Sequence, residues 1–108
     1  LEEGGLGNLT IVRGNVLDDG DIQAGAGFTV NRVATGTYEI DFNIPFADTP
    51  SATATQVFPD FTTFGGAGNT RDNAIINGIS TTQLRIVTGD GSGDESNRDF
   101  SFIVVGYR

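Results

Sequence analysis

Residues 25–50, GAGFTVNRVATGTYEIDFNIPFADTP, decide the fold class of this chain. Two runs within this segment alternate apolar and polar side chains, and the pair Thr35-Gly36 separates them. The apolar positions are Phe28 and Val30 before the turn, and Tyr38, Ile40, Phe42 and Ile44 after it. A period of two indicates strands with one face in a core and one in water. The segment therefore predicts a half-buried β-hairpin.

Five further segments have the length and composition of strands. They are residues 9–17, 51–58, 73–79, 83–88 and 99–107. Gly14 interrupts the first of them and is interpreted as a bulge. Short strands joined by turns rich in Gly, Asp and Thr are typical of sandwiches. We expect an all-β fold, an antiparallel β-sandwich of six to seven strands.

The length of 108 residues is that of one domain with one core. Residues 1–8 are Gly-rich, acidic and without periodicity, which predicts a linker or N-terminal arm before a single domain at residues 9–108. The sequence begins with Leu1 rather than Met, so we expect a fragment of a longer protein.

The charge balance excludes some classes of partner. The sequence contains fourteen acidic residues and six basic ones, all of them Arg, which gives a formal net charge of -8. Nucleic-acid and anionic-membrane surfaces require clustered positive charge, so we expect no nucleic-acid partner and no membrane insertion. The sequence contains no Cys and no His, which removes thiol nucleophiles, disulfides and the commonest general base and metal ligand. We expect no enzymatic activity.

The last segment, DFSFIVVGY at residues 99–107, is apolar on both faces from Phe102 onward. Such a strand lies between two covered layers, meets another subunit, or is a short edge tucked under a loop. In a two-layer sandwich the second option predicts an oligomer interface at Ile103, Val105 and Tyr107. Arg13 and Arg32 are in phase with residues interpreted as inward-facing, so each lies at a strand end or pairs with an acid, including one across a subunit boundary.

The long segment at residues 59–72 carries aromatic side chains without alternation. Phe58, Phe61 and Phe64 recur every third residue beside polar groups, and they either plug the end of the sandwich or form a contact surface. For the second case the predicted ligand-binding residues are Phe61, Phe64, Asn69, Arg71 and Asp72, with Arg71 able to make paired hydrogen bonds to a carboxylate or to sugar hydroxyls.

Two sets of acidic residues are candidates for metal binding or acid–base chemistry. Asp90, Asp94 and Glu95 place oxygen ligands near one another in a loop, which predicts either a non-EF-hand Ca²⁺ site or solvated turn residues; no other cofactor is expected. Glu39 and Asp41 share one strand face, where the wet side of the sheet is a simpler interpretation than an acid–base pair.

A family resemblance rests on turn and core residues from Leu9 onward. The residues that carry it are Arg13-Gly14-x-Val16, Gly27-Phe28-Thr29-Val30, Gly36-x-Tyr38, Phe42-x-x-Pro45-Phe46-x-x-x-Pro50, Ser80-Thr81-Thr82 and Phe100-Ser101-Phe102-Ile103. In this order they resemble small bacterial C-terminal head domains that follow collagen-like or other fibrous repeats. The second half is also similar to H-type lectins, which implies that the antiparallel β-sandwich is jelly-roll-like or H-type-lectin-like.

The resemblance implies a β-sandwich that assembles as a homotrimer, with strands of three subunits packed about the axis. It further implies an extracellular, cell-surface or particle-surface location, and glycans as a second class of partner. H-type lectins bind galactose-like sugars at subunit boundaries with polar and aromatic side chains. This chain has no Trp and no His, so the resemblance transfers no sugar-contact residue.

Overall fold

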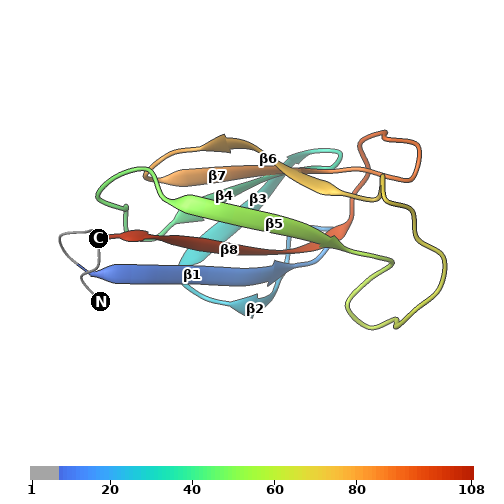
Figure 1. Cartoon of the computed structure of the whole chain (residues 1–108), viewed down its shortest axis with the longest axis horizontal. Helices are drawn as coiled ribbons and strands as arrows, with labels where there is room; N and C mark the ends of the chain where they lie inside the picture. Colours follow the sequence, from blue (N-terminus) through green and yellow to red (C-terminus); the bar gives the residue numbers. More distant parts are fainter. Residues whose placement is uncertain (1–7) are drawn as a thin grey trace.

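The computed structural model describes residues 8–108, and every regular element in that range is a β-strand (Figure 1). The strands are β1 (Leu9–Val16), β2 (Ile22–Gly25), β3 (Phe28–Ala34), β4 (Thr37–Phe42), β5 (Ser51–Val57), β6 (Ala74–Ile79), β7 (Gln83–Thr88) and β8 (Asp99–Tyr107). None of the elements in residues 8–108 is a helix of the length and apolarity that a bilayer span requires.

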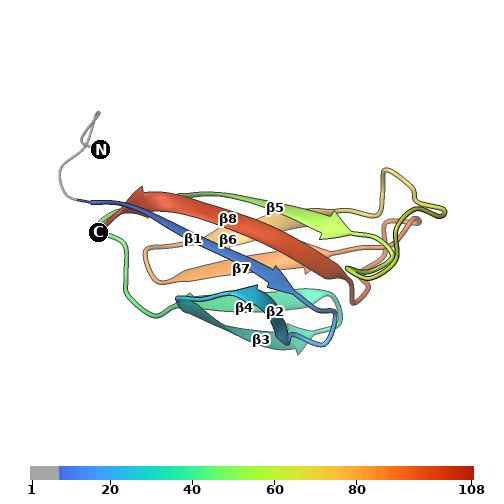
Figure 2. The same ribbon diagram turned by 90° about the horizontal axis from the view of Figure 1, so that it is seen from below.

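The strands form two antiparallel four-stranded sheets packed face to face as a β-sandwich (Figure 2). Sheet A has the order β2-β1-β8-β5 and sheet B the order β3-β4-β7-β6. The expectation of an all-β antiparallel sandwich is confirmed, but the strand count of six to seven is wrong. The eighth strand is β2, whose four residues Ile-Gln-Ala-Gly lack the alternation that marks the others.

The predicted hairpin is β3 paired with β4. Phe28 lies opposite Phe42 and Val30 opposite Ile40, and Gly36 turns with a φ of 70° that glycine adopts without strain. Ile44 was expected on the inward face, yet its side chain is 58% exposed. The alternation stops because β4 ends at Phe42, and the N–H of Asn43 bonds instead to the carbonyl of Gly27.

The core lies between β8 of sheet A and β4 and β7 of sheet B. Aromatic rings join the two sheets: Tyr38 and Phe100 have ring centroids 4.8 Å apart, and Phe28 meets Phe102 edge to face at 4.9 Å. The fully buried apolar side chains are Val16, Tyr38, Ile40, Leu84, Ile86, Phe100, Phe102 and Val104. Each comes from an inward position of its strand, so alternation alone builds this core.

Gly14 is a position where two aromatic rings, those of Phe28 and Phe102, approach the backbone closely, and its interpretation as a bulge is wrong. It pairs in regular register with Phe102, and the register shift of β1 falls later, between Asn15 and Val16 in the pairing with β2. A Cβ atom at Gly14 would collide with the ring of Phe28 and lie 2.8 Å from the ring of Phe102. Only glycine leaves room there for the edge-to-face aromatic pair.

The two ends of the described chain leave the sandwich side by side. Leu9 lies opposite Tyr107 in the β1–β8 ladder, and the N–H of Arg108 bonds to the carbonyl of Asn8 at 3.1 Å. The long loop between β5 and β6 and the loop between β7 and β8 lie at the opposite end (Figure 1). We call the end of the elongated domain with Asn8 and Arg108 the attachment end, and the end with the β5–β6 and β7–β8 loops the loop end.

Candidate functional site

The outer surface of sheet A carries an apolar patch in the middle of the sheet. β8 is central, with β1 on one side and β5 on the other, so the alternative of a short edge segment under a loop is wrong. Ile11 is 63% exposed and Ile103 51% exposed. Together with the half-buried Leu9, Val105 and Tyr107 they form what we call the outer apolar face.

The outer apolar face is also nearly free of charge. β1 and β5 contain no acidic residue, and the one acidic residue of β8, Asp99, is buried at the start of the strand. Arg13, opposite Ile103, is the one charged side chain that these three strands expose there. Strands β1, β5 and β8 thus expose no acidic side chain, and among the described residues the exposed Asp48 borders the face beside Leu9, Val105 and Tyr107.

Arg13 and Arg32, the two arginines predicted at inward positions, lie on different sheets and in different environments. Arg13 shares a face with Ile11, as expected, but that face is the outer one, because Val12 and Gly14 point into the core. The inward placement of Arg13 was therefore wrong. Arg32 is exposed near the end of β3, where its Nη1 donates to the carbonyl of Asp18 at 3.4 Å, which confirms the strand-end interpretation. Arg32 belongs to sheet B and does not join the outer apolar face.

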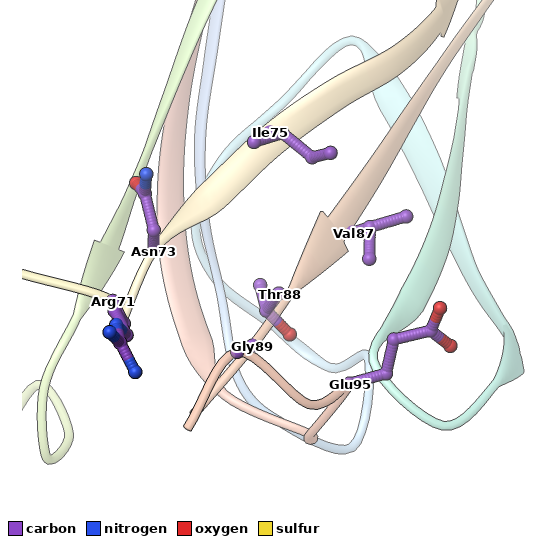
Figure 3. Close-up of a pocket in the computed structure, with 8 residues that line it drawn as sticks. Arg71, Asn73, Ile75, Val87, Thr88, Gly89 and Glu95 are labelled. Carbon is purple, nitrogen blue, oxygen red and sulfur yellow. The ribbon is translucent and has the colours of Figure 1, made fainter. Parts of the chain in front are cut away.

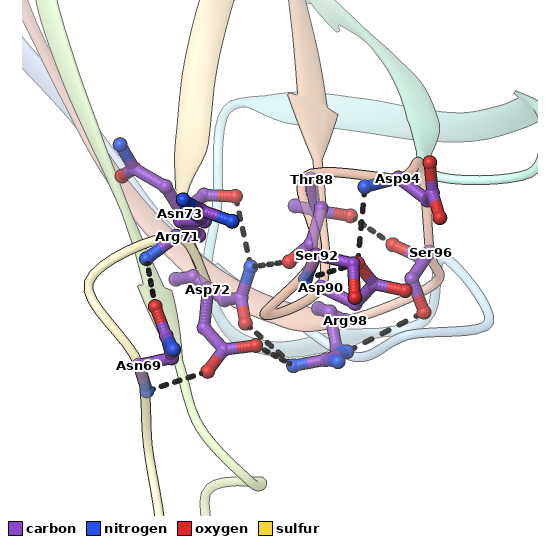
Figure 4. A network of polar contacts seen from close by, with 12 residues as sticks. Asn69, Arg71, Asp72, Asn73, Thr88, Asp90, Ser92, Asp94, Ser96 and Arg98 are labelled. Atoms are coloured by element: carbon purple, nitrogen blue, oxygen red, sulfur yellow. Dashed lines mark hydrogen bonds and ion pairs between the residues drawn. The ribbon is translucent and has the colours of Figure 1, made fainter.

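At the loop end, Arg98 ties three segments together (Figure 4). Its Nη1 donates to Gln56 Oε1 and to Asp72 Oδ1, each at 3.0 Å, and its Nε donates to Ser96 Oγ at 3.4 Å. The guanidinium also lies over the ring of Phe58, 4.6 Å from the centroid. Sequence reasoning missed Arg98, because a single Arg before a strand gives no signal that distant residues converge on it.

The predicted ligand-binding residues do not lie in one site. Asn69 and Asp72 close a turn, with Asn69 N–H donating to Asp72 Oδ2 at 2.7 Å, and they line an open cleft of about 380 Å³ beside Phe58 and Arg98. Arg71 is exposed and lines a different cleft.

The two phenylalanines of that prediction line neither of these clefts. Phe61 is partly buried, and its N–H donates to Asp99 Oδ2 at 3.1 Å. Phe64 is fully exposed, so the three aromatic residues do not act as one plug.

The cleft beside Arg71 opens on the outer side of sheet B (Figure 3). Its volume is about 160 Å³, and Ile75 and Val87 form its apolar part. Arg71 and Glu95 come from the two loops that border it, so the cleft combines one cation, one anion and an aliphatic surface.

The acidic loop between β7 and β8 uses its first carboxylate to hold its own turn. Asp90 Oδ1 accepts the N–H of Ser92 at 2.9 Å and that of Asp94 at 3.0 Å, and these bonds lower the pKa of Asp90 below its ordinary value. In residues 8–108 no three acidic side chains gather closely enough to hold a metal ion. Asp90, Asp94 and Glu95 are thus not brought together as a ligand set.

Two buried polar groups fasten the loop end to the core. The carboxylate of Asp99 accepts N–H groups from Asp18 and Phe61, and burial raises its pKa. The hydroxyl of Tyr38 donates to the carbonyl of Asp18 at 2.7 Å and accepts the N–H of Arg98, and burial raises its pKa as well. Both groups are engaged by backbone, which indicates a structural role.

Glu39 and Asp41 lie on the outer side of sheet B, as expected for a wet face. Glu39 forms an ion pair with Arg85 at 2.6 Å, and Asp41 accepts a hydrogen bond from Gln83 at 2.9 Å. Each carboxylate is occupied by a neighbour from β7 across the β4–β7 ladder.

Comparisons with protein-family models, with curated proteins and with solved structures find no match to this chain.

Proposed function

We propose that this domain is a non-enzymatic assembly module that associates with copies of itself through the outer apolar face of sheet A. The single observation that carries the proposal is that Ile11 and Ile103 are exposed at the centre of a sheet whose strands β1, β5 and β8 expose no acidic side chain. Charge depletion and apolar enrichment mark the centre of a protein interface.

The energetics favour association through this face over the others. Full burial of one isoleucine side chain contributes about 1.5–3 kcal/mol. Other surfaces carry acidic residues, including Glu39 and Asp41 on sheet B, and like charges would oppose contact between copies there. Burial of Ile11 and Ile103 against a second copy would remove from water the apolar side chains that a single chain leaves exposed on sheet A.

The resemblance to bacterial head domains suggests three subunits and a place at the end of an extracellular or particle-surface fibre. The geometry of the chain ends is compatible with this role. A fibre joined at Asn8 or Arg108 would leave from the attachment end and project the loop end outward.

The test is the mass of the protein by light scattering after size exclusion, at micromolar concentration. We expect a homotrimer for the unmodified chain and a monomer for Ile103→Lys, because a buried lysine at the centre of the interface loses its hydration. The matched control is Ile75→Lys, which changes a 55% exposed isoleucine on the outer side of sheet B and should leave the trimer intact. A folded monomer for the unmodified chain would refute the proposal.

A second candidate function is carbohydrate binding at the loop end. The observation that favours it is the open cleft in which Asn69 and Asp72 lie beside the ring of Phe58, since sugars bind where hydroxyl partners adjoin an aromatic surface. A glycan array probed with the assembled protein, with and without Ca²⁺, tests it. No bound glycan under either condition would exclude it.

A further inference from the structure

On one side of the sandwich the edge strands are β5 of sheet A and β6 of sheet B, and we call the incompletely buried apolar surface along them, formed by Ile76 and Ile79, the opening. The two strands approach each other near the C-terminal end of β5 and diverge toward the attachment end (Figures 1 and 2). At the close end, Gln56 Nε2 donates to the carbonyl of Asn73 at 2.8 Å and joins the two sheets. At the other end no equivalent side-chain bond between β5 and β6 occurs among the hydrogen bonds of residues 8–108.

Inward-facing side chains remain partly uncovered in this opening. Ile79 lies opposite the buried Leu84 in the β6–β7 ladder, and so faces inward, yet it is 37% exposed. Ile76 also packs against the core and is only partly buried. The inward-facing apolar residues of β5 are only Ala52 and Ala54, whose side chains are single methyl groups.

The edge of β5 is unprotected as well. β5 pairs with β8 in regular register over seven residues and contains no charged residue and no proline. The other three edge strands carry devices that discourage pairing: β2 has only four residues, and β2, β3 and β6 all lie in ladders with register shifts. In the described part of the chain no backbone group outside β8 bonds to the backbone of residues 51–57.

We propose that this opening binds an extended peptide segment, which adds to β5 as a fifth strand of sheet A. The backbone N–H and C=O groups of β5 that point away from β8 would form hydrogen bonds with the backbone of the added segment, as in other cases of strand addition. Because the side chains of a strand alternate between faces, every second side chain of the segment would point into the opening. Large aliphatic side chains at these positions would cover the partly exposed Ile76 and Ile79, which the single methyl groups of Ala52 and Ala54 do not do.

The composition of the opening defines the partner further. Neither β5 nor β6 contains a charged residue, so the segment is recognised by backbone bonds and aliphatic contacts, with little dependence on salt. A second copy of β5 fits less well, because its inward residues are Ala52, Ala54 and Gln56 and would leave the isoleucines uncovered. The occupant is therefore a segment of another protein with large aliphatic residues at alternate positions.

The experiment uses the full chain, labelled with ¹⁵N, and two capped peptides of identical composition. The first, KTITVTITK, alternates threonine with aliphatic residues, and the second, KTTIVITTK, places its aliphatic residues together. We expect the first peptide to shift the amide resonances of β5 and β6 and to slow hydrogen exchange along β5. The second should bind at least about tenfold more weakly, since it cannot direct the same three aliphatic side chains inward.

Two substitutions on one strand provide the matched control. Ile79→Ser removes an inward contact and should weaken binding of the alternating peptide about tenfold. Ile75→Ser alters the same strand on its outward face, where Ile75 is 55% exposed, and should leave the affinity unchanged. Both side chains are partly exposed, so both variants are expected to fold.

Several results would overturn the inference. They are equal affinity for the two peptides, no binding of either, or equal loss of affinity in the two variants. Protection of β5 amides that increases with protein concentration, without any peptide, would identify a second copy as the occupant instead. Ile103→Lys distinguishes this site from the proposed assembly surface, because it should abolish the trimer and leave peptide binding to β5 intact.

Discussion

The carboxylate of Asp99 accepts a hydrogen bond at 2.8 Å from the backbone N–H of Asp18, a residue 81 positions earlier in the chain. Its second oxygen accepts the N–H of Phe61. One buried side chain at the start of β8 thus holds both the β1–β2 turn and the β5–β6 loop, and it links segments that the strand ladders do not connect.

We expect Asp99→Ala to lower the free energy of unfolding by about 1–3 kcal/mol, because two N–H groups lose their acceptor. Asp99→Asn should have a smaller effect, since the amide keeps one of the two acceptor oxygens. Urea denaturation of the two variants and the unmodified protein measures both differences. Equal stability of all three would contradict the structural role.

The pH dependence of Asp99 has the opposite sign to that of most acids. Its folded pKa is raised above the ordinary value of 3.8, so the folded state binds the proton more readily than the unfolded state. Stability from this group therefore falls as pH rises through the folded pKa and is recovered on acidification. Relative to Asp99→Ala, the unmodified protein should gain stability in urea denaturation as pH is lowered from 7, and the gain should be complete below the ordinary value of 3.8.

Asp90 provides a contrasting case. The N–H groups of Asp94 and Ser92 lower its pKa, so its contribution to stability is present above pH 3.8 and is lost as pH falls through the folded pKa. We expect Asp90→Asn to lower the Tm at pH 6 and to have little effect near pH 2. A difference in Tm that stays constant across this range, measured by circular dichroism, would show that the carboxylate charge is unimportant.

The Arg98–Asp72 ion pair should be sensitive to the loss of one partner. The two side chains are 17% and 7% exposed and lie 3.0 Å apart. Asp72→Leu leaves a guanidinium with little solvent and should destabilise the fold by about 3 kcal/mol, whereas the double variant Asp72→Leu/Arg98→Met should recover part of that loss. A double-mutant cycle by chemical denaturation measures the coupling, and purely additive effects would argue against a working pair.

We expect that any side chain at Gly14 lowers the stability of the fold. Gly14→Ala would force a methyl group against the rings of Phe28 and Phe102 and should cost about 1–3 kcal/mol. Gly78→Ala is the matched control, because its Cβ would meet its nearest neighbour, Arg85, at an ordinary 3.5 Å. Similar thermal stability of the two variants would contradict the close packing at Gly14.

Alternation made most of the fold predictable. The hairpin of β3 and β4 and the limits of β7 follow from apolar periodicity, since the period of two fixes which face is buried, and the limits of β8 follow from a long apolar run. The pattern could not distinguish the inner from the outer surface of β1, whose Ile11 and Val12 are equally apolar. The structure assigns Val12 to the core, so the phase assigned to Arg13 was wrong.

The site was less predictable because its geometry depends on contacts between distant segments. The apolar residues of β8 marked the outer apolar face correctly, but its partner Ile11 became evident only from the register of β1 with β8. Arg98 meets Gln56 and Asp72 through loops of irregular backbone, which periodicity does not describe. The opening beside β5 likewise requires the relative orientation of two sheets.

The adjacency of the chain ends makes the domain a natural carrier for inserted sequences. Any fusion at Asn8 or Arg108 sits at the attachment end, while Gly65 and Gly66 lie in the β5–β6 loop with open space around them. A peptide epitope inserted between these two glycines would be presented at the pole farthest from the fusion point, without disturbing any strand ladder. The same scaffold could then display several copies of an epitope if the subunits assemble as proposed.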